Sequence, residues 1–250
     1  MNAEKYIAET IKGGYALEEM KDYRKIWQGD SKESIFELNM LYEDTGREWS
    51  KDFFSAFLTS ANIPGKSDRS VWEIDPEFLE SEFKTKEARL DSISAPFPSN
   101  DKQLVIRKYD QVEFYSANDP SEYAISNNLV LIRLADLILL RAEANFKTGK
   151  ENLALSDLNL IRNRAGLPSI QLSGDELFKE IFRERRRELI GEGTIQFDLI
   201  RMNLFKKFDE YSAYYTEERI ANKGYFWPLN MRALLPQNEK LTQNPYWANH

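Results

Sequence analysis

Two residue types that often carry catalysis and metal binding are nearly missing from this chain. Its 250 residues include no cysteine, and its single histidine is His250, the last residue. Without cysteine the chain cannot form disulfides, use a thiolate nucleophile or bind a metal through sulfur. With one terminal imidazole it also lacks the main component of catalytic triads, of histidine metal sites and of general-base chemistry. We therefore expect no catalytic residue, no metal site and no cofactor.

The chain also contains little glycine and proline, and it has no net positive charge. The chain has 11 Gly and 9 Pro, whereas 42% of its residues are hydrophobic and 13% are aromatic. This composition argues against disorder and against a glycine-rich cofactor fold. The formal net charge of −7 repels polyphosphate, so we expect no nucleic-acid partner.

Long uncharged apolar runs are absent as well. No apolar stretch follows a basic region after Met1, and the most apolar run, 129–146, is interrupted by Arg133, Asp136, Arg141 and Glu143. A membrane-spanning helix needs about 20 predominantly apolar residues. As given, the chain is expected to carry neither an export signal nor a membrane span.

The most informative stretch that is present is helical. Apolar residues at helical spacing predict a helix from Leu129 to Phe146, a turn at Thr148-Gly149-Lys150 and a returning helix that ends at Gly166. Small residues in the first helix permit close helix approach, and the motif order resembles a tetratricopeptide unit of about 34 residues. A third helix is predicted to follow and to stop at Gly191-Glu192-Gly193, which is a helix stop and not a phosphate cradle because no strand precedes it.

The remaining sequence completes a mainly α prediction with an irregular, loop-rich subdomain and a few short strands. We expect a single domain over 1–250. It should begin with a helical hairpin and strand at 1–41, followed by a loop-rich ligand-side region at 42–127. The helical hairpin and charged helix at 128–212 come next, and an extended tail at 213–250 is expected to strap across the helices. Within them we expect helices at 3–12, 17–27, 51–60 and 76–83, and strands at 34–41 and 104–109.

The run Glu184-Arg185-Arg186-Arg187-Glu188 could be taken for a phosphate-binding patch. Glu180, Glu184 and Glu188, however, lie three or four positions from Arg183, Arg185 or Arg187, and this pattern favours pairing within the helix. We therefore interpret the run as a structural ion network in which arginine forks hold carbonyls and carboxylates.

Loop aromatics are the remaining chemical resource. Among 41 acidic residues no local motif singles out a pair for glycoside hydrolysis, so a glycosidase is a minor alternative. Flat Trp and Tyr surfaces suit the apolar faces of sugar rings, and binding residues are often displayed on loops. We select Trp49, Trp72 and Tyr42 as ligand-binding candidates, with plain packing as the alternative for each. Phe53 and Phe54 are expected in the core.

Four motifs occur in a specific order: Ile132-Arg133-Leu134-Ala135-Asp136 with Leu140-Arg141-Ala142-Glu143-Ala144, Asp157-Leu158-Asn159 with Ile161–Leu167, Glu184–Gly193, and Phe197–Arg201. Upstream, Gly14-Tyr15 and Leu17 precede Ser31–Glu37. In these motifs the chain resembles the carboxy-terminal part of the SusD/RagB family, surface lipoproteins of Bacteroidetes that capture glycans or peptides for outer-membrane transporters. The resemblance covers most of this chain and about the second half of a full family member, without signal and lipid anchor.

The resemblance implies tetratricopeptide hairpins that face a TonB-dependent, SusC-like transporter and an irregular subdomain that faces the ligand. It implies an outer-membrane, cell-surface location, with the full-length protein held by a lipid anchor. Ligand loops of the family fall partly at 42–72 here, which agrees with the aromatic candidates. We expect a non-enzymatic binder of an oligosaccharide; a peptide ligand and a protein-interaction module without a glycan site are the alternatives.

Overall fold

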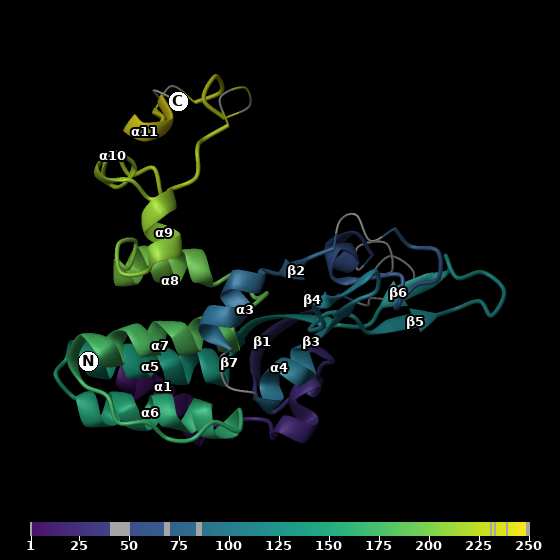
Figure 1. The fold of residues 1–250 in the computed structure, drawn as a ribbon, viewed down its shortest axis with the longest axis horizontal. Coiled ribbons are helices and arrows are strands. Elements are labelled where there is room, and N and C mark those ends of the chain that lie inside the picture. Colours follow the sequence, from purple (N-terminus) through teal and green to yellow (C-terminus); the bar gives the residue numbers. More distant parts are fainter. Residues whose placement is uncertain are drawn as a thin grey trace. The chain divides into compact units, whose positions relative to one another are not determined.

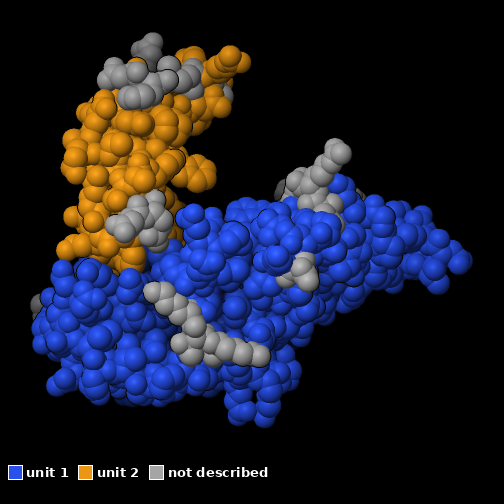
Figure 2. Space-filling model, in the orientation of Figure 1, with its two compact units in different colours: residues 1–193 blue, residues 194–250 orange. Residues whose placement is uncertain are grey.

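The computed structural model describes residues 2–40, 51–67, 71–83, 87–230, 232, 234–238 and 240–248. The chain forms two compact units, residues 1–193 (unit 1) and 194–250 (unit 2), which Figure 2 colours separately. Each unit is described by itself below. The fold is mainly helical with a few short strands, which confirms the predicted class.

The three longest helices of unit 1 pack together (Figure 1): α5 (Leu134–Lys147), α6 (Glu151–Arg164) and α7 (Gly174–Glu188). Helix α5 packs against α6, against α7 and against the first helix, α1 (Asn2–Lys12). Fully buried alanines on α5 and α6 allow this close approach. Gly149 turns the chain between α5 and α6 with φ of 75°, a left-handed conformation that glycine adopts without strain. The predicted helical hairpin is confirmed.

The start of that hairpin was predicted wrongly. Residues Asn128–Arg133 form strand β7, which pairs antiparallel with β1 (Ser34–Asn39), and the helix begins only at Leu134. The run is apolar enough to continue a helical pattern, but β1 needs a hydrogen-bonding partner, and the β-branched side chains of Val130 and Ile132 suit a pleated surface. Tertiary pairing therefore overrides the periodicity.

The rest of unit 1 consists of short elements (Figure 1). A 3-10 helix, η1, spans Met20–Trp27, so the predicted helix at 17–27 is shorter and more tightly wound than expected. Helices α3 (Pro76–Glu82) and α4 (Ala88–Ile93) and the turn η2 (Ser55–Phe57) follow, and residues 51–54 are helical. Strands β2 (Glu73–Ile74), β4 (Asn100–Ile106) and β3 (Ser94–Phe97) form one antiparallel sheet, in that order. The predicted strand at 104–109 is therefore displaced toward the N-terminus.

A two-stranded hairpin, β5 (Val112–Phe114) and β6 (Tyr123–Ile125), extends from this part of unit 1. Its base is buried, whereas the loop that joins the strands is exposed. Neither of these two strands was predicted from the sequence.

One hydrophobic cluster joins η1, the sheets and the segment after residue 51. Its fully buried rings belong to Tyr23, Trp27 and Phe54, with the ring of Tyr109 almost fully buried beside them. Trp27 meets Tyr23 edge-on at 5.3 Å between ring centroids, and Phe54 stacks on Tyr109 at 4.9 Å. Aromatic side chains dominate such cores because each buries a large apolar area in a fixed geometry. The exposed aromatic side chains of the candidate site pack on this buried cluster.

Unit 2 contains α8 (Ile195–Met202), α9 (Asp209–Tyr214), α10 (Glu217–Ala221) and α11 (Pro245–Ala248). The region from 213 onward is thus not wholly extended as predicted, and its strapping across the helices of unit 1 stays a prediction. The guanidinium of Arg219 lies 4.0 Å from the ring centroid of Tyr214 and 5.3 Å from those of Tyr246 and Trp247. This cation–π cluster holds α11 against α10. In neither unit does a described helix have the length and apolarity to cross a lipid bilayer.

Candidate functional site

A stacked pair of rings marks the candidate binding site of unit 1. Trp72 lies parallel to Phe57, with an interplanar angle of 18° and 5.8 Å between ring centroids. Trp72 is 58% exposed, so part of its indole packs on Phe57 while much of the indole surface faces solvent. An exposed flat ring with its other side supported can stack on the apolar face of a sugar.

Backbone hydrogen bonds hold Trp72 on both sides of its Cα. Its N–H donates to the carbonyl of Ala56 at 2.7 Å, and its carbonyl accepts from the N–H of Ile106 at 3.4 Å. The first contact joins Trp72 to η2, and the second joins it to β4, next to β2. Because both neighbours belong to ordered elements, the backbone that carries the ring needs no further ordering on binding.

A second layer of rings supports Phe57 from below. Phe57 lies 5.0 Å from Tyr109 and 6.5 Å from Phe54, and these two rings belong to the buried core. The Trp72–Phe57 pair is therefore anchored to the cluster that also contains Trp27. Burial raises the pKa of the Tyr109 hydroxyl far above its ordinary value, so this ring stays neutral.

The three ligand-binding candidates from the sequence have different outcomes. Trp72 is an exposed, supported ring, a placement compatible with ligand binding. Tyr42 and Trp49 lie in 41–50, outside the described residues, so their role stays a prediction. Of the two phenylalanines expected in the core, Phe54 is fully buried as predicted, whereas Phe53 is 52% exposed.

A buried network of charged side chains fixes the elements around this site. At its centre Glu188 of α7 accepts hydrogen bonds from Arg89 at 2.7 Å, from Arg133 at 2.6 Å, and from Arg164 and the hydroxyl of Tyr23. These donors come from α4, β7, α6 and η1. Burial alone would raise the pKa of Glu188, but the three guanidinium groups outweigh it and hold the pKa well below its ordinary range.

The network confirms a structural role for the charged run but corrects its predicted pairing. Within the helix Arg187 pairs with Glu184 at 2.6 Å, as the sequence suggested. Arg185 instead binds Asp136 of α5 at 2.7 Å, and Arg186 binds Glu82 of α3 at 2.9 Å. The side chains are buried, so the run does not form a phosphate-binding surface.

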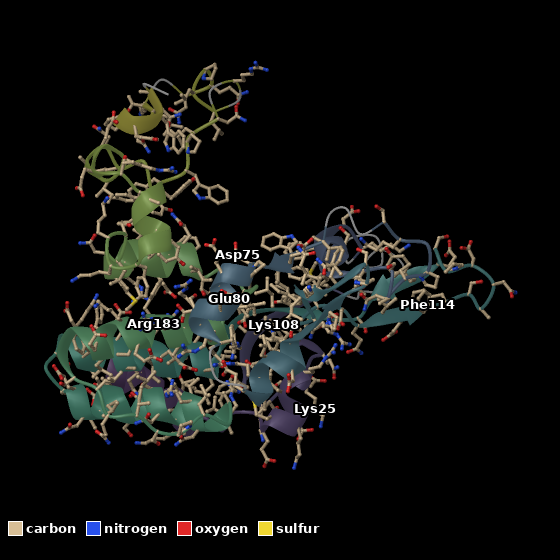
Figure 3. All side chains as sticks on the ribbon, viewed as in Figure 1. Lys25, Asp75, Glu80, Lys108, Phe114 and Arg183 are labelled. Carbon is tan, nitrogen blue, oxygen red and sulfur yellow. The ribbon has the colours of Figure 1, made fainter. Side chains whose placement is uncertain are left out.

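Lys108 contacts both the buried charge network and the buried aromatic cluster. Its Nζ donates to the carbonyl of Glu188 at 2.9 Å, pairs with Glu192, and lies 4.7 Å from the ring centroid of Trp27. Figure 3 shows Lys108 in the interior of unit 1. Burial lowers the pKa of its ammonium from 10.5 to about 8, against the raising effect of Glu192.

The described residues also contain a polar cavity of about 220 Å³ between α3, α6 and α7, lined by Glu82, Glu87, Glu180 and three arginines. Burial raises the pKa of Glu82 and of Glu87, a shift that can mark an acid–base residue. Both carboxylates, however, are held by arginines: Glu82 by Arg186 and Glu87 by Arg89 at 2.5 Å. Their ion pairs explain them as structural groups. Within the described ranges no three Asp, Glu, His or Cys side chains are grouped to hold a metal ion.

Two parts of the aromatic surface escaped the sequence analysis. Phe57 was not recognised as the support of Trp72, because the contact joins residues on different elements. The hairpin pair Phe114 and Tyr123, of which Phe114 is 46% exposed, was not selected. The alternation of polar and apolar residues from Gln111 to Phe114, before the turn residues Asn118–Ser121, was a signal that could have found the first of these strands.

With this geometry in place, comparison with known proteins is informative. A model of the SusD family matches residues 19–247. SusD-like protein P38 of Formosa agariphila is 35% identical over 168 residues, which make up 62% of this chain and 31% of that protein.

Solved structures agree with this match. A SusD homolog from Bacteroides thetaiotaomicron has a TM-score of 0.79 and 25% identity, covering 98% of this chain and 54% of the other. Surface glycan-binding protein A from Bacteroides uniformis has a TM-score of 0.64 and 22% identity, covering 97% of this chain and 56% of the other. The chain thus spans about half the length of these structures and about a third of the Formosa relative.

Proposed function

The chain belongs to the SusD family, and on that premise we propose that it captures an oligosaccharide at the bacterial cell surface without catalysing a reaction on it. The family consists of non-catalytic binding proteins. Among similar structures, one is named a surface glycan-binding protein and another a carbohydrate-binding protein. These names support a glycan as the class of ligand. Which sugar binds depends on the side chains of this chain that contact it.

The Trp72–Phe57 stack is the observation that carries the proposal. A pyranose ring has an apolar C–H face and a polar edge, so it binds best on a flat ring that is already desolvated on its far side. Trp72 meets this requirement because Phe57 covers part of it and ordered backbone fixes its position. Among the described residues, Glu82 and Glu87, whose carboxyl pKa values burial raises, are held in ion pairs with Arg186 and Arg89, which supports binding over chemistry.

We further propose that the captured glycan passes to a TonB-dependent, SusC-like transporter in the outer membrane, and that the full-length protein is lipid-anchored there. Family membership supports this location and this partner. Trp49 and Tyr42 remain proposed ligand contacts beside Trp72, because the segment 41–50 joins β1 to the helical residues that precede Phe57.

Calorimetric titration of the full chain against a panel of neutral oligosaccharides tests this function. Trp72→Ala should weaken binding of any captured sugar by about tenfold or more, since one lost ring contact is worth about 1 kcal/mol or somewhat more. Trp72→Phe should restore part of the affinity, because a smaller flat ring remains. Trp227→Ala is the matched control, since it removes an indole that is 84% exposed in unit 2.

Two results would count against the proposal. Unchanged affinity of Trp72→Ala for every sugar that wild type binds would remove Trp72 from the site. A wild-type chain that binds no glycan but co-purifies with a transporter would favour the alternative, a protein-interaction module built on the α5–α6 hairpin. Peptides in the same panel decide whether the ligand is a glycan at all.

A further inference from the structure

The hairpin β5–β6 presents a second aromatic surface in unit 1. Phe114 and Tyr123 are cross-strand partners, with 6.3 Å between their ring centroids. Phe114 is 46% exposed, although the base of the hairpin at Ala124 and Ile125 is fully buried. In Figure 3 Phe114 lies on the hairpin, away from the interior position of Lys108. The hairpin therefore displays an aromatic pair from a firmly anchored base.

The loop at the tip of the hairpin is polar and well ordered by its own hydrogen bonds. Asp119 accepts from the N–H of Ser121 at 2.9 Å and from its hydroxyl at 2.7 Å. Ser116 Oγ accepts from the N–H of Asn118 and of Asp119. Hydrogen bonds from Ser121 lower the pKa of Asp119, so its carboxylate stays charged. Hydroxyl, amide and carboxylate groups beside an exposed ring are the combination that sugar edges and faces require.

Lys51 ties the hairpin to the Trp72 site. Its Nζ lies 4.9 Å from the ring centroid of Tyr123 and donates to the carbonyl of Ser121 at 3.4 Å. Lys51 begins the helical residues 51–54, which also contain Phe53 and Phe54. The two surfaces are thus joined through a short, ordered helical segment.

A line of rings continues from that segment to Trp72. Phe53, which is 52% exposed, lies 5.1 Å from Phe54; Phe54 lies 6.5 Å from Phe57, on which Trp72 stacks. Exposed rings therefore occur at both ends of this line, with the buried Phe54 and the half-buried Phe57 between them, on one compact unit. Several exposed rings on one unit suit an extended ligand, because contacts that a rigid body holds together add their affinities at little further entropic cost.

We infer that the face of the β5–β6 hairpin that carries Phe114 and Tyr123 is a second glycan contact, which binds the far end of the oligosaccharide that Trp72 holds. This inference rests on the proposed glycan-binding function and extends it. The ligand is accordingly an extended neutral oligosaccharide and not a mono- or disaccharide. A short sugar occupies the Trp72 site alone, and a longer one reaches the hairpin.

A length series of oligosaccharides tests the inference on the full chain. The probes are malto-, xylo-, cello- and laminari-oligosaccharides from the disaccharide upward, titrated calorimetrically against wild type, Phe114→Ala and Trp72→Ala. We expect Phe114→Ala to weaken the longest bound members by roughly tenfold and to leave the shortest unchanged. Trp72→Ala should weaken all lengths.

Tyr115→Ala is the matched control. Tyr115 is 43% exposed and follows Phe114 directly, so strand alternation places it on the opposite face of the hairpin. Its replacement should leave affinity at every length within about twofold of wild type. Far-ultraviolet circular dichroism establishes that each variant keeps the fold.

The outcomes separate the two proposals. If wild type binds none of the series, the proposed function and this inference both fail. If Trp72→Ala loses binding while Phe114→Ala binds all lengths as wild type does, only this inference is overturned. Equal losses in Phe114→Ala and Tyr115→Ala overturn the assignment to one face. Loss of transporter binding in Phe114→Ala with unchanged glycan affinity identifies the hairpin as a protein contact and also overturns it.

Discussion

Replacement of Glu188 by glutamine is the sharpest test of how unit 1 is held together. The side chain is completely buried and accepts from Arg89, Arg133, Arg164 and Tyr23, which lie on four different elements. Glutamine has nearly the same shape, so Glu188→Gln opens no cavity. It removes the negative charge from between three guanidinium groups and places an amide donor where a carboxylate oxygen accepted.

The expected loss of stability follows from this arrangement. A surface ion pair contributes about 0–1 kcal/mol, because water screens and replaces it. A buried pair that loses one partner costs about 3–5 kcal/mol, because the remaining charge is left uncompensated in the interior. Glu188 has several such partners, so we expect a decrease in the free energy of unfolding of about 3–5 kcal/mol. This is a large share of the stability of an ordinary domain.

Urea unfolding followed by tryptophan fluorescence and by far-ultraviolet circular dichroism measures the effect, and coincident curves from both probes license a two-state treatment. The matched control is Glu176→Gln on the same helix, where the carboxylate is largely exposed and pairs with Lys179 at 2.8 Å. The control should change stability by about 0.5 kcal/mol or less. If the free energy of unfolding of Glu188→Gln lies within about 1 kcal/mol of wild type, the buried carboxylate does not hold these elements together.

Two further predictions concern titration and packing. Between pH 8 and 10.5 the folded chain releases the Lys108 proton before the unfolded chain does, because burial has lowered the pKa of Lys108. The free energy of unfolding should therefore rise with pH across this window, by at most about 3 kcal/mol, and a urea midpoint that falls instead would contradict the assignment. In unit 2, a Cβ at Gly224 would lie 2.5 Å from Cγ of Tyr246 and 2.7 Å from Cγ of Arg219. Gly224→Ala should displace α11 at a cost of about 1–3 kcal/mol, seen as faster amide exchange at 245–248, and unchanged exchange would mean that the backbone relaxes.

Local signals in the sequence were sufficient for much of the helical architecture. Apolar spacing located α5, α6 and α7, and the glycines that end them adopt positive φ, as at Gly166 and Gly191. These features depend on residues within one or two turns of each other, so the chain itself carries them. The short elements were predicted less well, since a strand such as β7 exists only because β1 lies beside it.

The candidate site was predictable in kind but not in composition. The supply of aromatic residues and the absence of catalytic side chains pointed to ring stacking on a sugar, and Trp72 was selected on that basis. Phe57 as its support, Phe53 as an exposed ring and the pair Phe114–Tyr123 required the structure. Side chains on different elements meet through tertiary packing, which residue spacing along the chain does not encode.

The charged run 184–188 separates the two levels of information most clearly. Its mixture of acidic and basic residues determined by itself that the charges compensate one another and that no phosphate-binding patch forms. Tertiary structure alone decided the partners, because a buried charge binds the nearest fixed opposite charge, whichever element supplies it. Arg185 thus binds Asp136 of α5, and Glu188 binds Arg89, Arg133 and Arg164, although helical spacing offered each of them nearer neighbours along the chain.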